Sequence, residues 1–146
     1  MLLDEPAENG KNVTLGKEGV MRENVPTEAP WAATVGYSRA VRVGDFVWVA
    51  GTAAVGEDGR IVAPGDAYRQ AQRCLEIIVS ALRRLGAEPK HVVRTRMFVR
   101  DPEDWEKVGR AHGEVFGDVK PATTMVFTKF IDPDILVEIE AEAVLQ

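Results

Sequence analysis

The segment 46–50 constrains the fold most, because the strand that it predicts is apolar on both faces. Its side chains alternate as Phe46, Trp48 and Ala50 on one face and Val47 and Val49 on the other. A strand of this kind belongs in a sheet that is covered on both sides. The tight turn Gly44-Asp45 joins it to a preceding candidate strand over residues 37–43, which predicts a β-hairpin.

Two amphipathic helices are predicted downstream of the hairpin. After Asp66, a capping residue, apolar residues recur at spacings of three and four up to Gly86, and a second helix begins at Asp101-Pro102 and ends at Gly117. Three more strands are predicted over residues 91–99, 122–130 and 136–144. In the first of these, one face is predicted to carry Val93, Thr95, Met97 and Val99.

The predicted order is therefore β-β-α-β-α-β-β, an α/β (α+β) fold. Two helices can cover one face of a sheet of four or five strands, so we expect the other face to contact other subunits. The length of 146 residues suits one domain. Residues 1–30 contain glycine, proline and scattered charges and are predicted to form an N-terminal extension or arm, with the domain over residues 31–146.

Composition excludes several functional classes. No apolar run is long enough to span a membrane, and the first residues lack the order of a signal peptide. The lone Cys74 favours a reducing compartment, so we expect a cytoplasmic protein. A net charge of −5 with dispersed basic residues argues against nucleic-acid binding. Cys74 falls on the apolar stripe of the first helix and is interpreted as a buried, inert thiol.

Polar residues on strands are the main candidates for chemistry. The chain has no phosphate-binding glycine loop, nucleophile elbow or paired cysteines, and we expect no metal and no cofactor. Its two histidines, His91 and His112, are interpreted as packed or surface residues. One face of the last strand carries Glu138, Glu140 and Glu142. These acids could form structural salt bridges with Arg39, Arg94 and Arg96, or one of them could hold a water in a ligand pocket.

Four segments together resemble the Rid (reactive intermediate deaminase) family, also called YjgF/YER057c/UK114. They are GYSRAVRVGDFVWVAGT, DAYRQAQRCLEIIVSALRRLGA, VVRTRMFVRD and KPATTMVFTKFIDPDILVEIEAEAV, and the resemblance extends over residues 37–145. It implies a chorismate-mutase-like fold, a homotrimer, and small-molecule pockets at the subunit interfaces.

The resemblance also implies roles for individual residues. Glu138 matches the glutamate that positions water for imine hydrolysis, and Tyr37 matches a pocket tyrosine. Thr123 stands where deaminases of this family have a carboxylate-binding arginine, and Met125 replaces a pocket cysteine. A hydroxyl lacks the charge and the paired donors of guanidinium, a loss of about 1.5–3 kcal/mol of binding. Arg39 or Arg96 could substitute for the missing arginine. The predicted ligand-binding set is Tyr37, Arg39, Trp48, Gly51, Arg96, Thr123 and Met125.

Two functional hypotheses follow. The first is a hydrolytic deaminase of reactive imine or enamine intermediates, in which Glu138 holds water in an intersubunit pocket. The second is a non-catalytic trimer that binds a small metabolite or regulates a partner, which the absence of the arginine favours. Ribonuclease activity, known for some relatives of the family, is a distant third because the chain is acidic and has no basic groove.

Overall fold

The computed structural model describes residues 5–7, 11–15 and 19–146. In chain order the strands and helices are β1 (Glu5–Ala7), β2 (Lys11–Leu15), β3 (Met21–Val25), α1 (Ala32–Val35), β4 (Ala40–Val43), β5 (Phe46–Ala53), α2 (Ala67–Arg84), η1 (Pro89–His91), β6 (Val92–Val99), η2 (Pro102–Asp104), α3 (Trp105–Phe116), β7 (Ala122–Phe127) and β8 (Val137–Val144). The strands of the described residues form one sheet in the order β1-β2-β3-β4-β5-β8-β6-β7. Neighbouring strands are antiparallel except β6 and β7, which are parallel.

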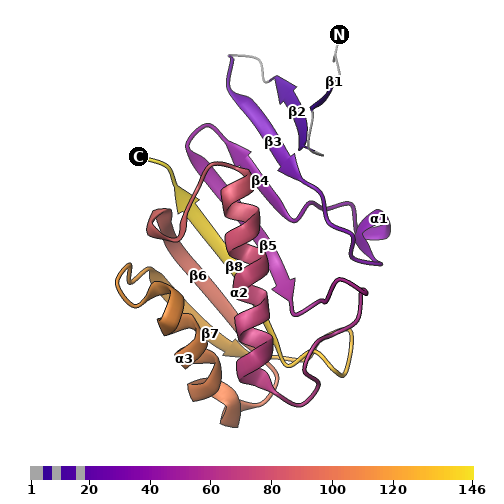
Figure 1. The fold of residues 1–146 in the computed structure, drawn as a ribbon, viewed down its shortest axis with the longest axis vertical. Helices are drawn as coiled ribbons and strands as arrows, with labels where there is room; N and C mark the ends of the chain where they lie inside the picture. The colour runs from indigo at the N-terminus through magenta and orange to yellow at the C-terminus, as the bar shows by residue number, and fades with distance from the viewer. Residues whose placement is uncertain (1–4, 8–10, 16–18) are drawn as a thin grey trace.

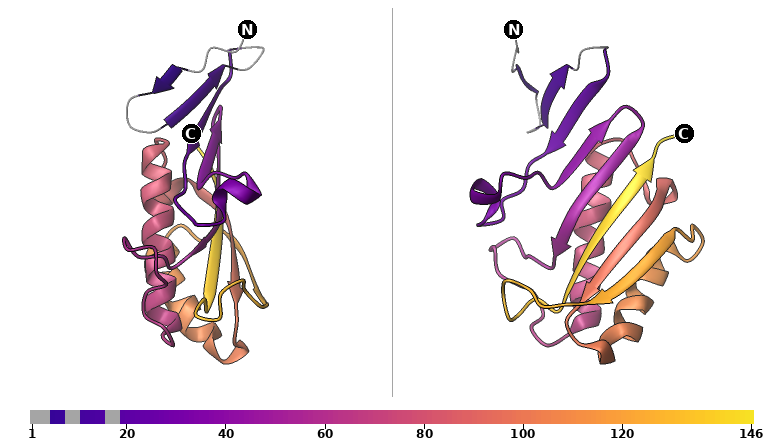
Figure 2. Two further views of the ribbon diagram at one scale, coloured as in Figure 1. Left: turned by 90° about the vertical axis from the view of Figure 1, so that its right-hand side faces the viewer. Right: turned by 180° about the vertical axis from the view of Figure 1, so that it is seen from behind.

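The sheet has helices on one face only. Figure 1 shows α2 and α3 side by side in front of the sheet, and the left view in Figure 2 shows both on the same side of it. From β4 to β8 the order of elements is the predicted β-β-α-β-α-β-β. The α+β fold with two helices on one face is therefore confirmed.

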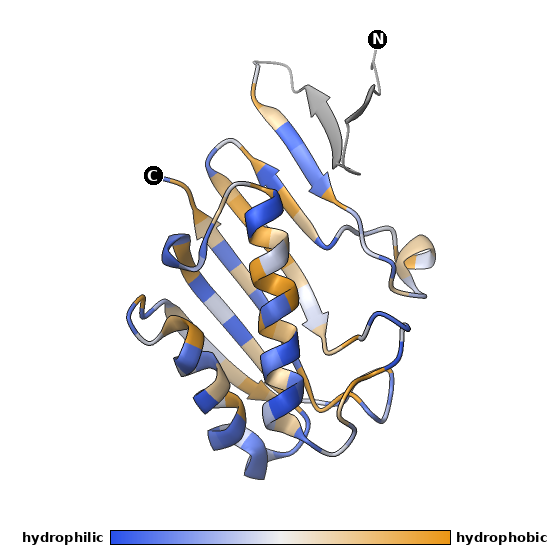
Figure 3. Cartoon of the chain, viewed as in Figure 1, coloured by the Kyte–Doolittle hydropathy of each residue, from blue (hydrophilic) through white to orange (hydrophobic). Residues whose placement is uncertain are grey.

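The core lies between this helical layer and the sheet. On α2 the buried side chains recur at helical spacing, and Leu75, Ile78 and Leu82 are at most 2% exposed. On β8 the buried residues alternate with half-buried ones, so that Val137, Ile139, Ala141 and Ala143 face the helices. Figure 3 shows hydrophilic bands separated by a paler one in the middle of β6. Asp66 caps α2 by accepting a hydrogen bond from the Arg69 N–H at 3.0 Å, as predicted.

The sheet is wider than the expected four or five strands. β3 pairs with β4 from Arg22 opposite Val43 to Val25 opposite Ala40, and β2 and β1 continue the sheet outward. Val25 is 1% exposed and packs in the core, whereas the rest of β3 is exposed or half-buried. Backbone pairing with β4, rather than an apolar face, holds this strand in the sheet. That explains why hydrophobic alternation did not reveal it. The division of the chain at residue 30 stays a prediction.

Three local features differ from the predictions. The strand expected over residues 37–43 begins only at Ala40, and Tyr37 to Arg39 lead into it. The strand expected over 122–130 ends at Phe127. Val93 does not share the buried face with Thr95, because a register shift between Val92 and Arg94 turns it outward and leaves it 47% exposed.

The face of the sheet away from the helices is partly apolar. Phe46 and Trp48 are 53% and 44% exposed, and their rings stack with centroids 5.9 Å apart. Among the described residues, no helix is both long and apolar enough to cross a membrane. Large apolar side chains left open on one face of a sheet mark a surface for association.

Candidate functional site

A cavity of about 690 Å³ lies beside residues 50–53 of β5, beyond the point where the pairing of β5 with β4 ends. β4 begins at Ala40, and β5 has a bulge between Val49 and Thr52, so residues 50–53 lack a β4 partner along that edge. The segment 25–37, the loop after β5 and one flank of α2 supply the other walls. Four predicted site residues line this cavity: Tyr37, Arg39, Gly51 and Glu138.

Glu138 is the carboxylate of this cavity. Its position on β8 is opposite Ala53 of β5 and Phe98 of β6, and an ideal Cβ built on Gly51 would lie 3.2 Å from its Oε2. Burial raises the pKa of Glu138 above its ordinary value, Arg39 opposes this rise, and the neighbouring Glu140 adds to it. A carboxyl group with a raised pKa is suited to accept and return a proton near neutral pH.

Arg39 ties the walls of the cavity together. Its Nη1 donates to the Gly51 carbonyl oxygen at 3.0 Å and to Thr52 Oγ1 at 2.7 Å, and its Nη2 donates to Thr27 Oγ1 at 3.2 Å. The guanidinium carbon lies 5.9 Å from the centroid of the Tyr37 ring. These contacts fix the bulge of β5 next to Glu138.

The other two acids of β8 are structural salt-bridge partners. Arg96 Nη1 lies 3.0 Å from Glu140 Oε1 and 3.0 Å from Glu142 Oε1, across the β6–β8 pairing. Glu138 forms no ion pair within the described residues. Salt bridges therefore account for Glu140 and Glu142. Arg96 pairs with these two acids and does not line the cavity of Glu138.

The remaining predicted residues lie elsewhere in this chain. Trp48 lines a separate cavity of about 480 Å³ on the open face, which also contains Tyr37, Glu140 and Glu142. Thr123 and Met125 belong to β7, which is separated from β8 by β6. Within one chain, the structure does not bring them to Glu138.

Thr123 takes part in a short chain of hydroxyl contacts at the sheet edge. Its Oγ1 lies 2.8 Å from Thr95 Oγ1, which in turn lies 2.8 Å from His112 Nε2 on α3. Burial lowers the pKa of His112, whose ring packs on Phe116 with centroids 4.8 Å apart.

The other histidine, His91, accepts a hydrogen bond from the Glu88 N–H at 2.9 Å. His112 is thus a packed residue, as predicted, whereas the capping role of His91 at η1 was not predicted.

Sequence reasoning missed the wall that the segment before Tyr37 contributes. Thr27 holds Arg39, while Glu28 and Trp31 line the cavity. These residues lie at the junction between the predicted arm and the domain, where no periodic pattern indicates a strand or helix. An aromatic residue at this boundary, Trp31, is the only signal that could have pointed to it.

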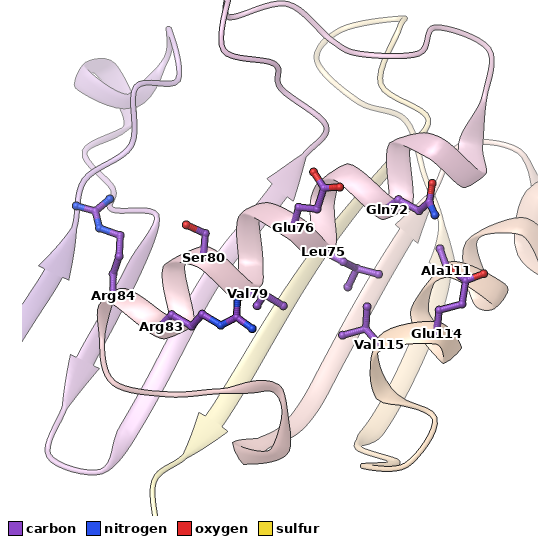
Figure 4. Close-up of a pocket in the computed structure, with 10 residues that line it drawn as sticks. All are labelled: Gln72, Leu75, Glu76, Val79, Ser80, Arg83, Arg84, Ala111, Glu114 and Val115. Atoms are coloured by element: carbon purple, nitrogen blue, oxygen red, sulfur yellow. The ribbon is translucent and has the colours of Figure 1, made fainter.

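A third cavity, of about 730 Å³, lies between α2 and α3. Figure 4 shows Leu75 of α2 and Val115 of α3 pointing toward each other across it. It contains none of the predicted site residues. Among the described residues, no group of three or more His, Cys, Asp or Glu side chains could hold a metal ion.

Comparison with known proteins agrees with this fold. The family described as Endoribonuclease L-PSP matches residues 27–145. An uncharacterized protein of Streptomyces coelicolor is 39% identical over 120 residues, which are 82% of this chain and 89% of the relative. The 3-aminoacrylate deaminase RutC of Acinetobacter baylyi is 31% identical over 127 residues, which are 87% of this chain and 97% of the relative.

A crystal structure has the same fold. It is a member of the YjgF/YER057c/UK114 family from Mycobacterium tuberculosis, with a TM-score of 0.76 and 41% identity, and the match covers 85% of this chain and 99% of that one. The resemblance seen in the sequence is therefore confirmed. The chain belongs to the Endoribonuclease L-PSP family, which is also the YjgF/YER057c/UK114 family.

Proposed function

We propose that this protein hydrolyses the C=N bond of reactive imines, and of enamines after they tautomerise to imines. The observation that carries the proposal is Glu138, a carboxyl group with a raised pKa that faces the Gly51 bulge of a cavity. A relative with 31% identity is described as a deaminase of 3-aminoacrylate, which is an enamine. Together these support a Rid-type deaminase.

The proposed step needs one positioned water and one proton carrier. Water held by the Glu138 carboxylate adds to the imine carbon while the carboxylate accepts a proton from it. The protonated Glu138 then returns this proton to the nitrogen, which gives a carbinolamine. Glu138 next carries the proton of the carbinolamine hydroxyl to the nitrogen, the C–N bond breaks as the C=O bond forms, and a carbonyl compound and ammonia leave. Holding the water and the imine in contact supplies much of the rate gain in a step of this kind.

We further propose that the working form is a cytoplasmic homotrimer with its pockets at the subunit interfaces. The exposed Phe46 and Trp48 on the helix-free face supply apolar surface for association. Association of this kind would also give Thr123 and Met125, on the edge strand β7, a route to the pocket of a neighbouring copy.

The geometry gives no support to ribonuclease chemistry at this cavity. Neither histidine of the chain lines it, since His91 caps η1 and His112 contacts Thr95. A binding role without turnover is the main alternative, because Thr123 stands where deaminases of this family have a carboxylate-binding arginine.

A semicarbazide competition assay tests the proposal. An oxidase generates imines in place, and a deaminase lowers the yield of semicarbazone because it removes the imine first. We expect the wild type to lower this yield and Glu138→Gln to lose at least 100-fold of the effect. Glu106→Gln, an exposed carboxylate on α3, is the matched control and should retain activity. Saturable ligand binding without loss of any imine would instead support the binding role.

A further inference from the structure

We infer that the cavity of Glu138 accepts imines and iminium ions that carry no carboxylate group. The inference rests on the proposed function and narrows its substrate class. It sets this chain apart from the relative described as acting on 3-aminoacrylate, a compound with a carboxylate. The evidence is the hydrogen bonding of the arginines that line the cavity.

Arg39 acts as a clamp on the protein rather than as a receptor for an anion. Both hydrogens of its Nη1 are used, on the Gly51 carbonyl oxygen and on Thr52 Oγ1, and one hydrogen of Nη2 is used on Thr27 Oγ1. A bidentate grip on a carboxylate through the two Nη atoms needs one free N–H on each of them. Arg39 therefore cannot offer this end-on grip without releasing the bulge of β5, and only its Nε–H and the second Nη2–H stay outside these three bonds.

The two other arginines of the cavity are also engaged. Arg73 donates from Nε to the Val55 carbonyl oxygen at 2.9 Å, and its Nη1 lies 3.3 Å from Glu76 Oε2. Arg84 has an interaction partner as well. Against these three arginines the cavity wall carries four carboxylates, Glu28, Glu57, Glu76 and Glu138. The cavity wall thus has no excess of positive charge that would attract a substrate carboxylate.

The hydroxyl of Thr123 adds no outward donor. Thr95 Oγ1 can donate to His112 Nε2, in which case Thr123 donates to Thr95. Alternatively His112 donates to Thr95 and Thr95 to Thr123, and the Thr123 proton then goes to the Pro121 carbonyl oxygen at 3.0 Å. In both arrangements the single proton of Thr123 is used inside the chain, so its oxygen presents only lone pairs. A group that accepts hydrogen bonds recognises N–H, not carboxylate.

Substrates of this class are the imines that form when simple primary amines are oxidised. They have the composition R–CH=NH, and water converts them to the aldehyde and ammonia. The reaction that supplies them is therefore an amine oxidation, in contrast to the amino-acid chemistry that yields 2-imino acids. The aromatic side chains Trp31 and Tyr37 on the cavity wall provide apolar contact for the R group.

A matched pair of imines tests the inference. A flavin amine oxidase forms the imine of benzylamine, and an amino-acid oxidase forms the imine of phenylglycine, which differs from the first only by a carboxylate. Semicarbazide competition then gives the second-order rate constant of the wild type for each imine. We expect the benzylamine imine to be favoured at least tenfold. Equal constants, or preference for the phenylglycine imine, would overturn the inference and leave the deaminase function standing.

If the protein accelerates the removal of neither imine, the proposed function is overturned and the inference falls with it.

Two variants locate the cause of the selectivity. Thr123→Arg should raise the constant for the phenylglycine imine relative to that for the benzylamine imine. Arg39→Gln should lower both constants by the same factor, because a clamp affects every substrate. A loss confined to the phenylglycine imine would show that Arg39 binds the carboxylate, contrary to the inference.

Discussion

Replacing Gly51 with alanine should damage the proposed chemistry while sparing the fold. The new Cβ would lie 3.2 Å from Glu138 Oε2, tighter than the separation of about 3.5–4.0 Å at which carbon contacts are most favourable. Glu138 would then move by about 0.3–0.8 Å, the shortfall in that contact. If a misplacement of 1 Å costs about 100-fold in rate, this shift costs on the order of four- to fortyfold.

The stability of this variant should not fall. Gly51 does not have a positive φ, so alanine fits its backbone, and the smaller entropy of the unfolded chain favours folding by about 0.4–1 kcal/mol. The matched control is Gly113→Ala on the exposed side of α3, where a new Cβ has nothing within 4 Å. That change should raise Tm without altering activity.

The assay is semicarbazide competition with the better of the two imines, together with Tm from circular dichroism. We expect Gly51→Ala to lose about four- to fortyfold in rate at an unchanged or higher Tm. Full activity in a folded Gly51→Ala variant would refute the reasoning, because the reacting carboxylate could not then lie against this bulge.

Three further predictions concern protonation and packing. Because burial raises the pKa of Glu138, its ionisation costs the folded state free energy, and stability falls as pH rises from the ordinary carboxyl value through the raised one. Glu138→Gln should therefore raise Tm at pH 7, and the gain should shrink at pH 4. An equal gain at both pH values would contradict this assignment. Thr95→Val should remove two 2.8 Å contacts at a residue 1% exposed and cost about 1–3 kcal/mol, measured by urea unfolding. A loss below 0.5 kcal/mol, outside that estimate, would show that the His112–Thr95–Thr123 chain adds little. Finally, Cys74 is fully buried and burial raises the pKa of its thiol, so a thiol reagent should modify it only after unfolding. Rapid reaction of the native protein would disprove this expectation.

The fold was predictable because its signals are local. Helical spacing marks α2, the Asp101-Pro102 start and Gly117 mark the segment of η2 and α3, and strict alternation marks β8. β3 escaped prediction because it is held by backbone pairing with β4, and backbone hydrogen bonds leave no imprint on the pattern of side chains. The outward turn of Val93 escaped for a similar reason, since a bulge breaks the period of two.

The sequence by itself determined the order of elements from β4 to β8, the burial of Cys74 and the two-faced hairpin, which all depend on residue type and short spacing. The resemblance to the family, and not spacing, pointed to Glu138 among the acids of the last strand. Only the tertiary structure decided which groups meet. Arg39 donates to the Gly51 carbonyl oxygen, and Arg96 forms salt bridges with Glu140 and Glu142. The hydroxyl of Thr123 forms its hydrogen bonds within the chain. Apart from the bond between Thr123 and Pro121, those contacts join residues 12 to 46 positions apart, and which donors remain for a ligand depends on distances that no local pattern contains.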